Sequence, residues 1–238
     1  MNKDIKSQVK KNRSSDTQNH ISSSMLICID VLSFFISLMP SVAALSFTGL
    51  LIARGYASTW LVLPLAPLVL FSSFIAIIFL IRICLPRLKS GRYKRELSKP
   101  VFAWFCHFAL SRAAKITGLS SILQSFNVTK FLYWRALGAK VSFQIMSSYD
   151  VNFVDCQLIT IGKNVTLGAQ VSISCHSDVG SLLLLSPVVI EDNVFIGMST
   201  VLGPGTIAKK GAWIGFGNSF VNRVIKENDK IKSKITEV

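Results

Sequence analysis

Residues 190–219 read IEDNVFIGMSTVLGPGTIAKKGAWIGFGNS, and an aliphatic or small residue returns at every sixth position. These positions are Ile190, Ile196, Leu202, Ala208 and Ile214. The same spacing occurs upstream at Ile161, Leu167 and Ile173. Glycine follows five of the eight repeated residues. Because a period of six matches neither an α-helix nor a simple β-strand, it predicts short strands separated by corners.

Three such repeats predict one triangular turn of about 18 residues, in which each repeated side chain points inward and stacks on its equivalent one turn away. Glycine after the inward residue lets the backbone bend without a Cβ clash. Because each turn buries its faces only against the next turn, several turns are needed for stability. We therefore expect a β-helix domain over residues 136–222.

The pattern aliphatic-Gly-x-x-small-x is clearest in residues 161–166 (IGKNVT) and 196–201 (IGMSTV). It resembles the repeat of the hexapeptide-repeat acyltransferases, and residues 133–141 (YWRALGAKV) are similar to the approach to the first turn in that superfamily. The resemblance implies a mainly β fold, a left-handed parallel β-helix, and a homotrimer. It also implies an acyl donor between neighbouring subunits, either an acyl carrier protein or an acyl-coenzyme A, with acetyl-coenzyme A as the default.

The repeat slips once, because Ile173 and Ile190 lie 17 residues apart rather than 18. A turn cannot close there with its usual spacing, so we expect a loop that leaves the prism. Loops on a rigid scaffold commonly carry functional sites, and His176 is the only histidine of the repeat region. The resemblance implies that His176 is the general base that takes the proton from an acceptor hydroxyl or amine. A histidine that only caps a surface turn is the alternative.

A general base needs an orienting group, and Asp155 precedes His176 by 21 residues, which is close to one turn. Asp155 is therefore a candidate catalytic partner, with Asp150 and Asp178 as alternatives. Each of these aspartates is also typical of a turn residue that bonds its own backbone. Cys175 adjoins His176, but adjacent strand residues face opposite sides, which favours a packed thiol over a nucleophile.

The resemblance implies a donor site on the later turns. The candidates are the backbone amides around Gly197, Gly203 and Gly215 for the pantetheine arm, Lys209 and Lys210 for the phosphates, and Trp213 as a shield for the thioester. A solvated basic corner is the alternative for the lysines, and a surface or trimer contact is the alternative for the tryptophan.

Two other activities of this superfamily are excluded. The carbonic anhydrases of this fold hold zinc with three histidines, whereas His20 and His107 lie outside the repeat region, so we expect no metal site. A nucleotidyltransferase of this superfamily would need a nucleotide-binding domain ahead of the β-helix, but two apolar segments occupy that part of the sequence. The five cysteines form no CxxC pair, which predicts reduced thiols.

Apolar and basic residues are segregated ahead of the repeat, although the chain has a net charge of +14. Residues 25–53 carry one charge, Asp30, and residues 60–81 carry none, so each segment has the roughly 20 apolar residues that a bilayer-spanning helix needs. This arrangement favours a membrane over nucleic acid as a partner. Basic residues flank the two spans, whereas the connector has only Arg54. The positive-inside rule therefore predicts both termini and the β-helix on the cytoplasmic side of a cell inner membrane.

Five segments are expected from the sequence. They are a disordered basic tail at 1–24, a two-helix transmembrane hairpin at 25–85, a basic, amphipathic helical linker at 86–135, the β-helix at 136–222 and a C-terminal tail at 223–238. The helix expected near residues 100–115 either lies in the headgroup layer or packs on the hairpin.

The expected function is a membrane-anchored acyltransferase that acts on a sugar or a lipid-linked acceptor. A hairpin followed by a β-helix with Ser174, Cys175 and His176 before a loop is also similar to modules at the C-terminal ends of certain membrane-bound peptide synthetases. That resemblance implies amide-bond formation from carrier-bound aminoacyl groups. A β-helix scaffold without catalytic activity is the third possibility.

Overall fold

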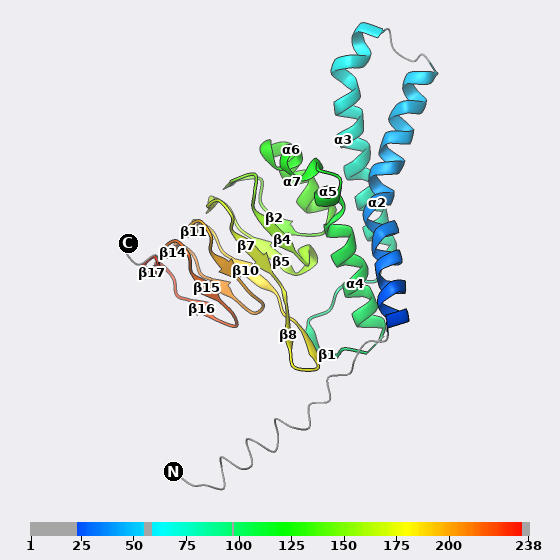
Figure 1. Ribbon diagram of the computed structural model, residues 1–238. Helices are drawn as coiled ribbons and strands as arrows, with labels where there is room; N and C mark the ends of the chain where they lie inside the picture. Colours follow the sequence, from blue (N-terminus) through cyan, green and yellow to red (C-terminus); the bar gives the residue numbers. More distant parts are fainter. Residues whose placement is uncertain (1–22, 55–58, 97, 235–238) are drawn as a thin grey trace, which may run out of the picture.

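The structure is a computed structural model that describes residues 23–54, 59–96 and 98–234. Most of the tail expected at 1–24 lies outside the described residues. Two parts are visible in Figure 1: a group of helices with a long hairpin, and a β-helix beside it. The predicted fold class, a parallel β-helix preceded by two long apolar helices, is confirmed.

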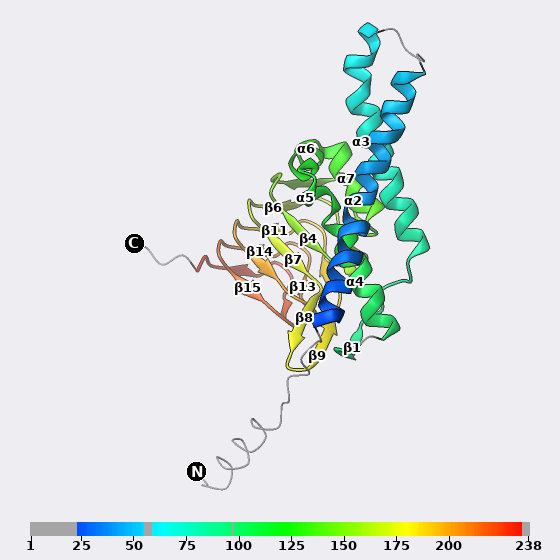
Figure 2. The ribbon, with the colours of Figure 1, turned by 45° about the vertical axis from the view of Figure 1, so that its right-hand side comes forward.

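Helices α2 (Ser23–Ala53) and α3 (Thr59–Cys84) form the hairpin, and their connected ends project beyond the other elements in Figures 1 and 2. The segments Ile27–Ala53 and Leu65–Cys84 have mean hydropathies of 2.0 and 2.4 and are long and apolar enough to cross a membrane. Large apolar side chains along α2 are exposed, among them Phe34 at 60%. An exposed apolar surface of this extent is typical of a site that contacts a membrane or another protein.

Four shorter helices lie between the hairpin and the β-helix (Figures 1 and 2). They are α4 (Lys99–Ser111), α5 (Ala113–Ile116), α6 (Leu119–Ser125) and α7 (Asn127–Ala136). Helix α4 packs along α2, where the Ser37 hydroxyl donates a hydrogen bond of 2.8 Å to the carbonyl oxygen of Ala109. Helix α7 packs against α3. The helix expected near residues 100–115 therefore packs on the hairpin.

The β-helix has three parallel sheets, one for each face of the prism. The first contains β2 (Lys140–Val141), β5 (Ile159–Ile161), β10 (Val188–Ile190), β13 (Ile207–Ala208) and β16 (Val224–Ile225). The second contains β3 (Ile145–Ser147), β6 (Val165–Leu167), β11 (Phe195–Ile196), β14 (Trp213–Ile214) and β17 (Lys230–Ile231). The third contains β4 (Asn152–Val154), β7 (Ser172–Ser174), β12 (Val201–Leu202) and β15 (Ser219–Phe220).

The strand register places the repeated residues where the period predicts them. Ile161 pairs with Ile190, and Ile196 pairs with Ile214 one turn further on. All eight repeated side chains are at most 2% exposed, and full burial of each aliphatic side chain contributes about 1.5–3 kcal/mol. Gly197 allows the turns to approach closely, because a Cβ atom there would lie 2.7 Å from the backbone of Gly215.

Two boundaries differ from the sequence-based expectation. The β-helix does not end at residue 222, because β16 and β17 add further parallel pairs. The inward residues Ala208 and Ile225 pair although they are 17 rather than 18 residues apart, so the strict period hides this last turn. The linker at 86–135, expected to be helical, also contains the strand β1 (Gly91–Lys94).

The slip in the repeat corresponds to a β-hairpin of β8 (His176–Val179) and β9 (Leu182–Leu185), which leaves the prism as a loop was expected to do. Its strand β9 pairs on its other edge with β1, which makes a three-stranded antiparallel sheet. The apolar run of β9 would otherwise expose an unpaired edge, which β1 covers. The β8–β9 hairpin thereby connects the β-helix to β1, in the segment that follows α3.

Candidate active site

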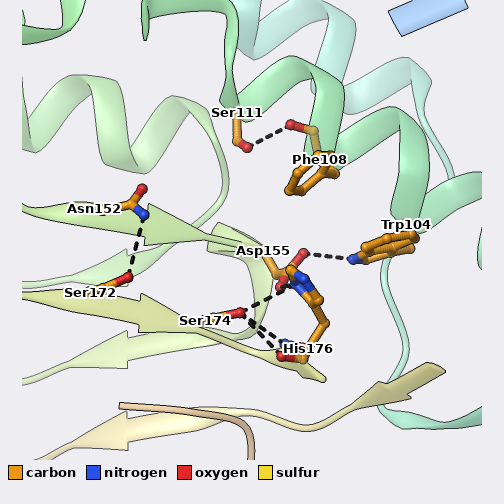
Figure 3. Close-up of polar contacts among 8 residues, drawn as sticks. All are labelled: Trp104, Phe108, Ser111, Asn152, Asp155, Ser172, Ser174 and His176. Atoms are coloured by element: carbon orange, nitrogen blue, oxygen red, sulfur yellow. Dashed lines mark hydrogen bonds and ion pairs between the residues drawn. The ribbon is translucent and has the colours of Figure 1, made fainter. Parts of the chain in front are cut away.

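His176 and Asp155 come from neighbouring turns and meet beside the third sheet (Figure 3). His176 is the first residue of β8, and Asp155 follows β4 in the left-handed conformation, with φ 60° and ψ 47°. The turn at Asp155 directs its carboxylate toward the imidazole. His176 Nδ1 lies 2.6 Å from Asp155 Oδ2, so the structure brings the two predicted residues together.

A third side chain completes this arrangement from the helical layer. The indole Nε1–H of Trp104, on α4, donates a hydrogen bond of 2.9 Å to Asp155 Oδ1 (Figure 3). Asp155 is 1% exposed. One of its carboxylate oxygens contacts His176 on β8 and the other contacts Trp104 on α4. The sequence analysis did not single out Trp104 as a site residue. Its aromatic-rich surroundings at residues 100–108 were the available signal, but they indicate only an apolar helix.

Aromatic rings from α4 also contact the imidazole. The Trp104 ring lies 5.1 Å from that of His176, and the Phe108 ring lies 5.9 Å away, both edge-on. The His176 side chain remains 22% exposed, whereas that of Asp155 is fully buried. Within the described part of the chain no hydrogen bond engages Nε2 of His176. The geometry therefore orients the ring through Nδ1 and leaves Nε2 accessible.

The electrostatic surroundings of His176 have opposing effects. Burial lowers the pKa of the imidazole, but the hydrogen bond and the charge of Asp155, together with the charge of Asp178, raise it. The net result is a pKa above the ordinary value of 6.5. The carboxylate thus stabilises the imidazolium ion that forms when Nε2 accepts a proton.

The alternatives near His176 have other surroundings. Asp178, two residues further along β8, is half exposed and lies 3.7 Å from Arg95 in an ion pair. Asp150 is not among the hydrogen-bond partners that the structure gives to His176. Cys175 is completely buried, which raises the pKa of its thiol, so it is a packed thiol as the strand alternation predicts.

A cavity of about 250 Å³ is lined in part by Trp104. Its walls come from the first turns of α2, from α4 and from the β8–β9 hairpin, and they include Leu32, Phe105 and Leu183. Arg95 and Asp178 provide polar groups at the same cavity. An apolar cavity with a few polar groups, lined by the same Trp104 that contacts the His176–Asp155 pair, is suited to the apolar part of a substrate.

The donor candidates are placed less favourably than the sequence suggested. The amide N–H groups of Gly197, Gly203 and Gly215 donate to carbonyl oxygens of the next turn, at 2.7–2.8 Å, and so are not free for a ligand. Lys209 Nζ lies 2.7 Å from Glu191 Oε1 in an ion pair.

Two donor candidates remain accessible on the surface of the later turns. The side chain of Lys210 is exposed, and its backbone N–H donates to Glu191. The Trp213 ring is 38% exposed and stacks on Phe195, with 5.4 Å between ring centroids.

The other histidine of the described residues, His107, is buried. His107 on α4 is 5% exposed, and its Nε2 lies 2.8 Å from the carbonyl oxygen of Pro86. Burial lowers its pKa more strongly than the Pro86 carbonyl raises it. Across residues 23–54, 59–96 and 98–234, no group of three or more His, Cys, Asp or Glu side chains is arranged to hold a metal ion.

Comparison with known proteins adds sequence relatives. No protein-family model matches the chain. A protein of Schizosaccharomyces pombe described as a "putative acetyltransferase" is 32% identical over 81 residues, which cover 31% of this chain and 39% of that protein. The delta-poly-L-ornithine synthetase of Acinetobacter baumannii is 27% identical over 147 residues, which cover 61% of this chain and 10% of the synthetase. The chain thus spans well under half the length of either relative.

Comparison with solved structures finds acetyltransferases at low sequence identity. A maltose O-acetyltransferase from Clostridium difficile aligns with 62% of this chain and 90% of its own, at 20% identity and a TM-score of 0.47. A hexapeptide-repeat acetyltransferase from Vibrio cholerae in complex with acetyl-coenzyme A aligns with 58% and 87%, at 16% identity and a TM-score of 0.37. The six-residue repeat and the register between turns show that the second half of this chain is a hexapeptide-repeat β-helix.

Proposed function

We propose that this protein is a membrane-anchored acyltransferase that moves an acetyl group from coenzyme A to a hydroxyl or amine of a sugar or lipid-linked acceptor. The observation that carries the proposal is the His176–Asp155 pair: a buried carboxylate holds Nδ1 of the imidazole at 2.6 Å. This contact selects the tautomer with the proton on Nδ1 and leaves the Nε2 lone pair for the acceptor.

The proposed reaction uses Nε2 twice. As the acceptor oxygen or nitrogen attacks the thioester carbonyl, Nε2 takes its proton, and the negative charge of Asp155 stabilises the resulting imidazolium ion. When the carbon–sulfur bond breaks, Nε2 returns that proton to the departing thiolate of coenzyme A. A positioned base of this kind typically contributes about 10²- to 10⁴-fold to the rate.

The donor is proposed to lie along the later turns, against a neighbouring subunit of a homotrimer. The side chains of Lys210 and Trp213 are the candidate contacts that remain accessible, for a phosphate and for the thioester arm. Lys209 is a weaker candidate because Glu191 already neutralises its charge.

The acceptor is proposed to approach from the membrane side. The cavity beside Trp104 is lined partly by α2, whose segment Ile27–Ala53 is apolar enough to cross a membrane. An acceptor with an apolar tail would thus place the tail in this cavity and its reactive group near Nε2. Basic residues on both flanks of the hairpin support a cytoplasmic location of the termini and of the β-helix at an inner membrane.

The test is transfer of labelled acetyl groups by purified full-length protein in lipid nanodiscs, with free sugars and lipid-linked sugars as acceptors. We expect transfer by the wild type and by Ser177→Ala, a neighbouring change on the same strand, but not by His176→Ala. Activity of His176→Ala equal to that of the wild type would contradict the proposal and favour a scaffold without catalysis.

A second candidate function is amide-bond formation from an aminoacyl group on a carrier protein. The similarity to the delta-poly-L-ornithine synthetase over 61% of this chain favours this candidate. The same histidine would then deprotonate an attacking amine. Amine-dependent condensation in the presence of a loaded carrier protein, without transfer from acetyl-coenzyme A, would support this function over the first.

A further inference from the structure

A second cavity, remote in sequence from the His176 loop, lies between α3, α7 and the start of β2. Helices α3 and α7 pack together in this part of the molecule (Figure 1). Its volume is about 540 Å³. One wall consists of the α3 residues Ser72, Ile75, Ala76, Phe79 and Arg82, which follow one another at helical spacing. Leu132 and Arg135 on α7 and Lys140 on β2 form much of the opposite wall.

The charge in this groove is positive and is not neutralised. Arg82, Arg135 and Lys140 line it, and none of its described lining residues is acidic. The three ion pairs in the described part of the chain involve other cations. Arg135 is also close enough to Arg82 for their charges to repel each other. The groove therefore offers three cationic side chains to an anion.

Arg82 is held in place with one of its hydrogen-bond donors, Nε, left without a partner among the described residues. Its guanidinium lies 5.0 Å from the centre of the Phe79 ring, and its stem packs against Gly138, where a Cβ atom would lie 3.1 Å from Arg82 Cδ. Its Nε is closed off from solvent and has no hydrogen-bond partner among the described residues. A buried donor of this kind is costly unless an acceptor binds to it.

Polarity changes along the groove in the order expected of a bilayer. Ile75 and Phe79 provide apolar surface on α3, and the cation Arg82 follows toward the end of the segment Leu65–Cys84. The rise from Ile75 to Arg82 is about 10 Å along the helix. This order matches the passage from acyl chain to headgroup phosphate, and Leu132, 46% exposed on α7, extends the apolar wall.

We propose that this groove binds one anionic phospholipid of the cytoplasmic leaflet, with its phosphate on Arg82, Arg135 and Lys140 and its chains along Ile75, Phe79 and Leu132. The proposal rests on the proposed insertion of the hairpin and is independent of acyl transfer. Basic pockets beside membrane helices on the cytoplasmic side are suited to lipid headgroups, and each nearby cation strengthens such binding about fivefold.

The test uses full-length protein in nanodiscs of phosphatidylcholine with added phosphatidylglycerol, followed by native mass spectrometry of the lipids that remain bound. We expect wild-type protein to retain one phosphatidylglycerol in preference to phosphatidylcholine. Arg135→Gln with Lys140→Gln removes two exposed cations and should lower this preference about 25-fold. Lys226→Gln with Lys230→Gln, at the far end of the β-helix, removes the same charge and should leave the preference unchanged.

Arg135→Lys keeps the charge and should retain most of the preference. Equal retention of both lipids by the wild type, or an equal loss in the distant double variant, would overturn the proposal. Displacement of the lipid by millimolar inorganic phosphate would also overturn it, because the groove would then recognise a free anion. Failure of the wild type to enter nanodiscs would overturn hairpin insertion as well, whereas entry without lipid preference would contradict the groove alone.

Discussion

The β-helix and helix α4 meet at His176 and contribute to it in different ways. The β-helix supplies the imidazole and its carboxylate partner from neighbouring turns, 2.6 Å apart. Helix α4, which packs on α2, supplies Trp104 and Phe108. Trp104 contacts both Asp155 and His176, and Phe108 contacts His176. The comparison indicates that the β-helix side carries the proposed base and its carboxylate, whereas the helical layer contributes to the orientation and burial of that carboxylate. The proposed chemistry therefore depends on contacts between the two parts.

The largest effect is expected from His176→Ala, on the β-helix side. Loss of the proposed base should lower kcat/KM about 10²- to 10⁴-fold without a comparable change in thermal stability, since the side chain is partly exposed. Acetyl-transfer kinetics and thermal unfolding measured on the same sample check this expectation. Activity equal to that of the wild type would show that His176, on the β-helix side, is not the base.

Asp155→Asn should lower kcat/KM about 10²-fold at pH 7, because the orienting charge is lost. The direction in which kcat/KM changes with pH can also be predicted. The wild-type base is active when neutral, so its rate should fall as pH decreases through a pKa above 6.5. Without the charge of Asp155 the effect of burial prevails, and the inflection should move to lower pH. An unchanged inflection in kcat/KM against pH would argue against this pairing.

Gly197→Ala tests how closely the turns of the β-helix are packed, in comparison with helix α2 of the α2–α3 hairpin. A Cβ atom at Gly197 would lie 2.7 Å from the backbone of the next turn, so unfolding should become easier by about 1–3 kcal/mol. Gly49→Ala in α2 is the matched control, since nothing lies within 4 Å of its added Cβ. Denaturant unfolding of both variants measures the difference, and equal stabilities would contradict the close approach between turns.

Trp104→Phe tests the helical side and should have the smallest effect on activity of the three changes at the candidate site. It leaves a buried oxygen of Asp155 without its donor, at a cost of about 1–3 kcal/mol, and should lower kcat/KM about 10-fold. Since the carboxylate then holds the His176 proton more tightly, the inflection should move to higher pH, opposite to Asp155→Asn.

Trp134→Phe removes an indole elsewhere, from the stack on Phe153, and is the control for Trp104→Phe. It should lower stability and leave the pH inflection in place. A shift of the same sign in Trp104→Phe and Asp155→Asn would show that the indole does not act through the carboxylate.

Particular residues show how far prediction from sequence reached. The inward positions from Ile161 to Ile214, the departure of the chain after Ile173 and the proximity of Asp155 to His176 all follow from spacing along the chain. The roles expected for the amides around Gly197, Gly203 and Gly215 stay predictions, and spacing did not show that the three glycine N–H groups donate to the next turn. The last turn was missed because its spacing is one residue short.

The sequence by itself determined the β-helix, the two apolar helices and the candidate base. These properties are carried by local periods and by unbroken apolar runs, which are readable without knowledge of distant contacts. Tertiary structure alone decided that Trp104 binds a carboxylate 51 residues away, that β1 pairs with β9, and that Arg82 and Lys140 share one groove. Such pairs depend on how separate elements pack, and no repeat or local composition specifies which side chains packing brings together.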